Sequence, residues 1–215
     1  MKKRDFNLTE KEIKLFKSLN SPAKIQNFIN KIPVNFEKDG KDTCYSPRKV
    51  LKENECHCIE GAILAALILR VNGYLPLLVD LTASKQDFDH VIAVFQKDSK
   101  WGAITKTNHY SLRYREPVYS SIRELVMSYF HEYFNESGKK TLRSYSNPID
   151  LSMFDHENWM TKEGELWEIP EYLAEVEHFP ILTKKQIANL QKADKIELEA
   201  NKLVEYKSKS MKRNL

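Results

Sequence analysis

The sequence predicts an α+β fold in which a buried helix packs on an antiparallel sheet. Residues 58–71 are apolar on nearly every side, which is typical of a helix enclosed by the rest of the protein. The segments that follow, 75–81, 90–95 and 101–105, have the composition of β-strands and are joined by short polar turns. A chain of 215 residues, 41% of them hydrophobic, can bury a core of this kind.

Further helices are predicted ahead of this core, and we expect them to cover it. Thr9 and Glu12 form a capping-box pattern, in which a hydroxyl and a carboxylate three residues later satisfy free N–H groups at a helix start. Ser21-Pro22 predicts a second helix start, because proline is well tolerated at the first helical position. A short helix should follow over residues 46–51.

Two more helices are predicted in the second half of the chain. Ser121 and Glu124 repeat the capping-box pattern, and Gly138 should end the helix that they begin. Thr183 should cap a final helix that runs to roughly Tyr206, although its apolar positions are sparse. The fold therefore carries added helices at both of its ends.

The charges suggest how the chain is divided. Residues 146–180 carry nine acidic residues against one lysine, and two tryptophans, so we expect irregular structure packed by aromatic side chains. We assign residues 1–145 to the core with its N-terminal helical cover. Residues 146–215 form a C-terminal extension that packs on this core. The basic residues at its end can dock on the acidic segment.

Composition restricts the partners that we expect. The net charge is only +4, which gives no reason to expect nucleic acid. The longest apolar run, 62–69, is too short to cross a bilayer, and the first residues lack the pattern of a signal peptide. Three cysteines, an odd number, suit a reducing compartment better than a disulfide scaffold. We therefore predict a cytoplasmic protein without nucleic-acid or membrane partners.

Cys58 is the residue that points to chemistry. It lies where the buried helix should begin, and the free N–H groups and dipole of a helix start favour a thiolate over a thiol. His90 opens a predicted strand 32 residues later. A cysteine and a histidine placed in this way can form a nucleophile and its base, an arrangement that geometry defines and sequence adjacency does not.

These residues belong to a longer pattern, which resembles the transglutaminase-like superfamily. The pattern is Cys58-x-Glu-Gly-Ala, an apolar helix ending in Arg70-x-x-Gly, then Asp-His90-Val and Trp101. It covers about residues 46–108. The resemblance implies a papain-like cysteine-enzyme core, in which a cysteine starts the central helix, a histidine opens a strand and an aspartate or asparagine lies on the next strand.

The third residue of such a site departs from the family pattern, because the usual aspartate after Trp101 is missing. If Gln96 pairs with Trp101, His90 faces Thr107, whereas a three-residue hairpin loop places Asn108 opposite His90. We predict that Asn108 orients the imidazole, which completes a Cys-His-Asn set. A site without a third residue is also open. Other candidates for this position are Thr105, Thr107 and Asp89.

The chemistry implied by the resemblance is acyl transfer at an amide. The Cys58 thiolate attacks the carbonyl, and His90 protonates the leaving amine. Water then resolves the thioester in a peptidase or amidase, and an amine does so in a transglutaminase; the sequence does not choose. No cofactor is needed. The expected substrate is a peptide, a protein or a small amide, and the oligomeric state stays open.

Four residues are candidates for contacts with the substrate. Arg113 and Arg115 lie among tyrosines and can receive a carboxylate or phosphate, although a solvated strand explains them equally well. Glu60 suits the first turn of the helix for electrostatic reasons alone, so a substrate contact is the second interpretation. Trp101 is added because it belongs to the family pattern.

Two other readings compete with an enzyme. Cys56-His57-Cys58 can bind zinc together with Cys44 or His90, but the Cys-x-Cys spacing is not that of common zinc sites. We therefore assign no metal and take Cys56 and His57 as neighbours that shape the pocket. The other reading is a catalytically inactive relative that binds a peptide or protein in the same cleft.

Overall fold

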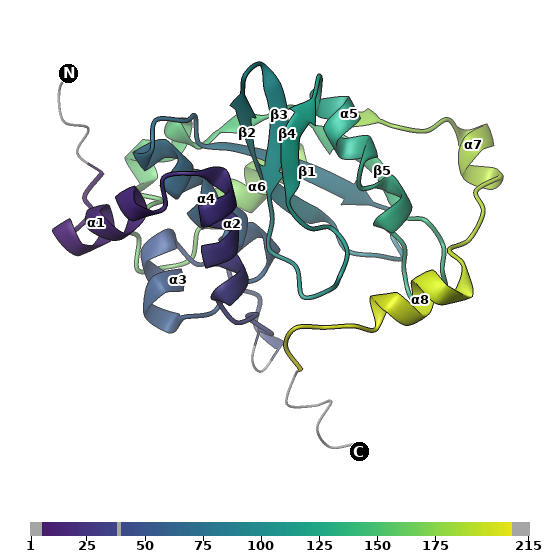
Figure 1. The fold of residues 1–215 in the computed structure, drawn as a ribbon, viewed down its shortest axis with the longest axis horizontal. Coiled ribbons are helices and arrows are strands. Elements are labelled where there is room, and N and C mark those ends of the chain that lie inside the picture. Colours follow the sequence, from purple (N-terminus) through teal and green to yellow (C-terminus); the bar gives the residue numbers. More distant parts are fainter. Residues whose placement is uncertain (1–5, 38–39, 208–215) are drawn as a thin grey trace.

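The computed structural model describes residues 6–37 and 40–207, and it confirms the α+β class (Figure 1). Its α-helices are α1 (Glu10–Ser18), α2 (Pro22–Lys31), α3 (Pro47–Glu53), α4 (Cys58–Val71), α5 (Ile122–Met127), α6 (Glu168–Glu175), α7 (Lys184–Ala188) and α8 (Lys195–Asn201). Its strands are β1 (Leu77–Ala83), β2 (His90–Lys97), β3 (Lys100–Ile104), β4 (Arg115–Tyr119), β5 (Leu142–Ser146), β6 (Ile149–Asp150) and β7 (His178–Pro180). Two 3-10 helices are η2 (Phe130–Glu132) and η3 (Leu151–Glu157).

The described strands form one seven-stranded sheet in the order β4-β3-β2-β1-β5-β7, and β6 also pairs with β1. The pairs are antiparallel, as predicted. Gln96 lies opposite Trp101, so the structure selects this one of the two hairpin registers that the sequence left open. Asp98 and Ser99 take positive φ angles of 50° and 60°, which suit the tight two-residue turn of a twisted hairpin.

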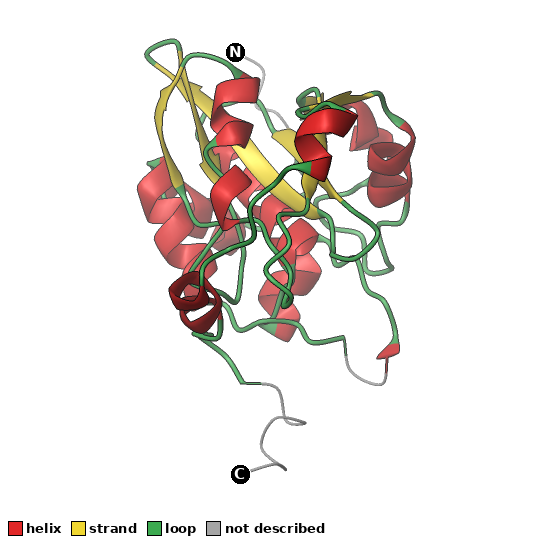
Figure 2. Cartoon of the chain, turned by 90° about the vertical axis from the view of Figure 1, so that its right-hand side faces the viewer, coloured by secondary structure: helices red, strands yellow, loops and turns green. Residues whose placement is uncertain are grey.

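Helix α4 is the centre of the fold. It is buried beyond its first residue, and it packs on the face of the sheet that carries Leu78, Ala93 and Phe95. Helices α1, α2 and α3 cover its other sides, as expected. The opposite face of the sheet carries a second apolar cluster, to which α5 contributes Leu125 and Val126. Helices therefore flank the sheet on both faces (Figure 2).

The helix predicted from Ser121 to Gly138 is wrong in length. Helix α5 begins after Ser121 but ends at Met127. The Ser128 carbonyl accepts a hydrogen bond from Arg115, and this competes with continued helical bonding. Gly138 lies in a turn with a φ angle of +78°. Residues 135–137 of the same turn line the candidate site.

The final helix is also different from the prediction. The chain forms two short helices, α7 and α8, with an interruption at residues 189–194. Asp194 begins α8 with a capping box of its own, and the N–H group of Ala193 donates to the Gly138 carbonyl instead of continuing α7. Few apolar side chains were available to hold one long helix against the core.

The acidic segment is more regular than expected. It contributes β6, η3, α6 and β7, and its strands join the sheet of the core. Trp159 is fully buried in the cluster around α4, whereas Trp167 is 40% exposed. Asp155 receives two hydrogen bonds from Arg70, at 2.5 and 2.6 Å, and so attaches this segment to the end of α4. Across residues 6–37 and 40–207, no helix has the length and apolar composition needed to cross a bilayer.

Candidate active site

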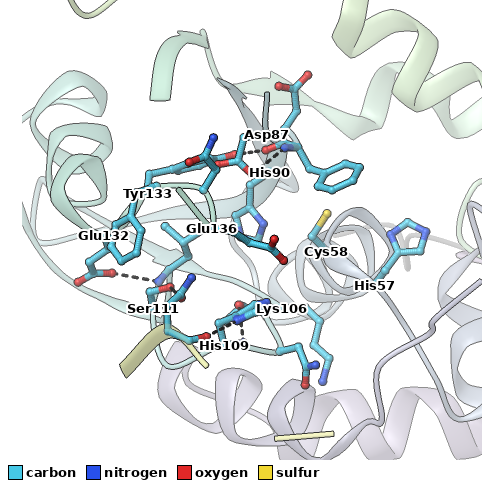
Figure 3. A pocket seen from close by; sticks show the side chains of 18 of the residues that line it. His57, Cys58, Asp87, His90, Lys106, His109, Ser111, Glu132, Tyr133 and Glu136 are labelled. Carbon is cyan, nitrogen blue, oxygen red and sulfur yellow. Dashed lines mark hydrogen bonds between the residues drawn. The ribbon is translucent and has the colours of Figure 1, made fainter. Parts of the chain in front are cut away.

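Cys58 opens into a cleft with a volume of about 650 Å³ (Figure 3). It is the first residue of α4 and is partly exposed, with His57 as the N-cap residue. Four stretches of chain form most of the wall: 56–58, 86–90, 106–112 and 132–137. The helix start, the entry to β2 and two loops therefore meet around one thiol.

The Cys58 thiol differs from the other two cysteines in its ionisation. Burial opposes the thiolate, but hydrogen bonds and positive charge from His57 and His90 outweigh it and lower the pKa of Cys58 to about 5. Burial acts without such partners at the other positions: it raises the pKa of Cys56 to about 12 and that of Cys44 far above its ordinary value. Of the three thiols, Cys58 is the one whose ionisation suits a nucleophile.

His90 is held by Thr105. The imidazole is buried at the start of β2, and its Nε2 lies 3.2 Å from the Thr105 hydroxyl oxygen. That hydroxyl donates its own hydrogen to the Leu112 carbonyl at 2.7 Å, so it can only accept from His90. The neutral ring therefore carries its proton on Nε2, which leaves Nδ1 free to exchange a proton at the sulfur.

Asn108 does not contact His90 in this structure. Its side-chain amide donates to the Tyr206 carbonyl and accepts from the Tyr206 N–H group, both at 2.9 Å. Strand β3 ends at Ile104, so the chain has left the ladder before it reaches Asn108. Thr105, one of the other candidates, contacts His90 at the place predicted for Asn108.

The other two candidates for this position are also used elsewhere. The Asp89 carboxylate accepts from the backbone N–H group of Ala83 at 2.6 Å. The Thr107 hydroxyl accepts from the backbone N–H group of His109 at 3.1 Å. Thr105 is thus the alternative that the geometry selects.

His57 is a second partner of the thiolate, which sequence reasoning missed. Its Nε2 donates to the Thr43 carbonyl at 2.8 Å and lies 3.4 Å from the Glu60 carboxylate. Burial favours the neutral ring, but the hydrogen bond to Cys58 and the charge of Glu60 raise the pKa of His57 to about 9. Cys58 lies between His57 and His90 (Figure 3). The only sequence signal was that His57 precedes Cys58.

Glu60 is not placed to bind a substrate. It is fully buried, and its carboxylate accepts from the Thr43 hydroxyl at 2.8 Å and from the N–H groups of Tyr45 and His57 at 2.9 Å. Asn35 donates a further bond at 3.3 Å. Glu60 therefore fastens the preceding loop to the start of α4 and balances the charge of His57.

The remaining substrate candidates lie away from the Cys58 cleft. Trp101 is half-buried in the apolar cluster on the α5 side of the sheet. Arg113 forms an ion pair with Glu205 at 3.1 Å, and it lines a separate, smaller depression. Arg115 donates to Glu132 at 2.8 Å and lies over the ring of Tyr129. Strand position alone did not tell which side chains would reach the cleft.

The described residues give no sign of a metal centre, and the family models and curated proteins compared give no match. Within the part of the chain that the structure describes, no group of three or more His, Cys, Asp or Glu side chains is arranged to hold a metal ion. Comparisons with protein-family models and with curated proteins found no match to the chain. The resemblance to the transglutaminase-like superfamily therefore rests on the residues quoted above.

Proposed function

We propose that this protein is a cysteine-dependent acyl-transfer enzyme that acts on amides, with a papain-like arrangement of its core. The observation that supports this most directly is the pairing of Cys58 with two histidines at the wall of a cleft. The two histidines lower the pKa of this thiol to about 5, whereas burial raises the pKa values of Cys56 and Cys44. A thiolate that persists at neutral pH beside an imidazole is what nucleophilic catalysis requires.

The reaction follows from these groups. The Cys58 thiolate attacks the amide carbonyl, a C–S bond forms, and the oxyanion is stabilised by the backbone N–H group of Cys58 at the helix start. His90 gives a proton to the amine nitrogen, the C–N bond breaks, and a thioester remains. His90 then takes a proton from water or an incoming amine, whose attack releases the acyl group and restores the thiolate.

Activity is the direct test of this proposal. The full chain should cleave, or transfer the acyl group of, members of a fluorogenic peptide-amide library, and a thioester on Cys58 should be detected by mass spectrometry after acid quenching. Cys58→Ala should lose both signals. The function would be rejected if Cys58→Ala matched the wild type. Peptide binding without turnover would favour the alternative of an inactive relative.

Thr105 should act as a positioning residue for His90. We expect Thr105→Val to lower kcat about tenfold to a hundredfold with little change in KM, because a buried imidazole loses the hydrogen bond that sets its tautomer. Steady-state kinetics over a range of pH tests this, since a misplaced imidazole also shifts the profile. Thr107→Val is the matched control, because that hydroxyl contacts a backbone N–H group and not His90. Equal kinetics for the two variants would show that Thr105 does not position His90.

A further inference from the structure

Glu136 is a free charge in the cleft. It lines the wall, it is exposed, and in Figure 3 its carboxylate points into the space beside His90 and Cys58. Among the residues that the structure describes, it has neither a hydrogen-bond partner nor an ion-pair partner. A carboxylate that is satisfied only by solvent can exchange that solvent for a charged group of a ligand.

The other acids of the wall are already occupied. Glu132 accepts from Arg115 at 2.8 Å and from the N–H group of Leu112 at 3.0 Å. Asp87 accepts from the Thr141 hydroxyl and from a backbone N–H group at 2.9 Å. Asp89 accepts from a backbone N–H group at 2.6 Å. These carboxylates therefore support the wall, and Glu136 is the one left for a ligand.

Two cations that line the cleft are also committed. Lys106 is buried, and its ammonium donates to the carbonyls of Ile29 and Ile32 and lies over the ring of Tyr206. His57 faces the buried carboxylate of Glu60. Neither group contacts Glu136, so within the described residues no lysine or arginine side chain neutralises its charge.

Glu136 is presented by a built turn. The Asn135 side chain accepts from the N–H groups of Ser137 and Lys139, at 3.1 and 3.2 Å, and from the Ser137 hydroxyl at 2.8 Å. Asn135 and Lys139 also donate to Gln86, each at 3.3 Å, in the segment that leads to His90. The backbone that carries Glu136 is thus fixed relative to the segment that leads to His90, which reduces the backbone ordering needed on binding.

Phe88 supplies an apolar surface at the same cleft. Its side chain is 89% exposed although it lines the wall, and it lies in the chain between Asp87 and Asp89. A ring of this kind can cover the hydrocarbon stem of a lysine or arginine side chain and attract its charge. The cleft then combines one ring, one free carboxylate and the reactive thiolate.

We infer that the preferred substrate is an amide with a positively charged side chain near the reacting carbonyl, and that Glu136 receives this ammonium or guanidinium group. The inference rests on the proposed function and names its substrate class. Phe88 packs against the stem of the same side chain. Glu136 acts as a specificity residue, so its removal should reduce selectivity for charge, and a neutral reagent separates this effect from any change in the reactivity of the thiolate.

Charged thiol reagents test the inference without a known substrate. Three methanethiosulfonates of similar size, carrying a trimethylammonium group, a sulfonate or no charge, are reacted with Cys58 at low ionic strength. We expect the ratio of the cationic to the anionic rate to fall about fivefold or more in Glu136→Gln, because a carboxylate near the sulfur attracts one reagent and repels the other. The difference should shrink at high salt.

Glu177→Gln is the matched control, because it removes the same charge from an exposed position outside the cleft. An unchanged ratio in Glu136→Gln, or an equal change in Glu177→Gln, would overturn the inference. The neutral reagent reports separately on the proposed function: slow reaction at neutral pH in the wild type would reject the thiolate, and the inference with it. If the neutral rate is high and only the charge ratio fails, the function stands and the substrate class does not.

The substrate itself provides the second readout. Fluorogenic amides of lysine and glutamine are compared at matched concentration in wild type and Glu136→Gln. We expect the KM for the lysine amide to rise about tenfold in the variant, while the KM for the glutamine amide stays the same. Equal KM values for the two amides in the wild type would overturn the assigned substrate class.

Discussion

Alkylation of Cys58 by iodoacetamide should show a midpoint near pH 5, and His90→Ala should raise that midpoint by about one to three units. The direction follows from the charges: burial raises the pKa of this thiol, and only the two histidines bring it down. When one of them is removed, the thiolate loses a hydrogen bond and a nearby positive charge. Its pKa must then move back toward the ordinary value of about 8.5.

Mass spectrometry that resolves the three cysteines makes this measurement. Cys44 and Cys56 serve as internal references, because both are buried and should react only at alkaline pH or after unfolding. His109→Ala is the matched variant: His109 lines the same cleft but donates to the Asn201 carbonyl. A wild-type midpoint near 8.5, or equal shifts in His90→Ala and His109→Ala, would contradict the thiolate–imidazole pair.

The same titration of Cys58 in the His57→Ala variant tests the contribution of His57. The hydrogen bond between His57 and Cys58 raises the pKa of the ring to about 9 and lowers that of the thiol. We expect its removal to raise the midpoint of Cys58 as well. If only His90 mattered, His57 would be a residue that merely joins the Thr43 loop to the helix start.

Replacing Glu60 should have the largest effect on stability. We expect Glu60→Ala to lower the free energy of unfolding by about 3–5 kcal/mol, because the carboxylate is fully buried and satisfies donors from Asn35, Thr43, Tyr45 and His57. Without it, these donors stay buried and unpaired, and the imidazolium of His57 loses its counter-charge. Urea unfolding followed by circular dichroism measures the change.

Glu10→Ala is the control that separates the effect of burial on stability from the effect of the helix dipole. Glu10 also lies in the first turn of a helix, α1, but it is exposed. Its removal should cost less than about 1 kcal/mol, which is the usual size of the dipole effect at the surface. If Glu60→Ala were as mild as Glu10→Ala, the hydrogen bonds seen around Glu60 would not stabilise the folded state.

Local patterns predicted the frame of the site well. Hydroxyl caps marked the starts of α1, α2, α3 and α5, and the apolar run placed α4 over residues 58–71. The β2–β3 hairpin was also predicted, although its register was left open between two alternatives, of which the structure has the one that pairs Gln96 with Trp101. These features depend on neighbours within a few residues, and the sequence states those neighbours directly.

The partners of the two reactive side chains were harder to predict. Asn108 is three positions from Thr105 in the sequence, but strand β3 ends at Ile104 and Asn108 binds Tyr206, far along the chain. Arg113 and Arg115 were chosen for their residue type, and packing turned both away from the cleft. Glu136 was hidden inside a helix that the structure replaces with a turn.

The sequence by itself therefore determined the α+β class and the positions of Cys58 at a helix start and His90 at a strand start, because caps, periodicity and turns act locally. Only the tertiary structure decided that Thr105 holds His90, that His57 and Glu60 set the charge around the thiol, and that Glu136 faces the cleft. Thr105 contacts His90 from beyond the next strand, Glu136 lines the cleft from a distant turn, and the Thr43 loop fixes His57 beside Glu60. A hydrogen bond a few ångströms long depends on where every intervening element ends, which no local pattern specifies.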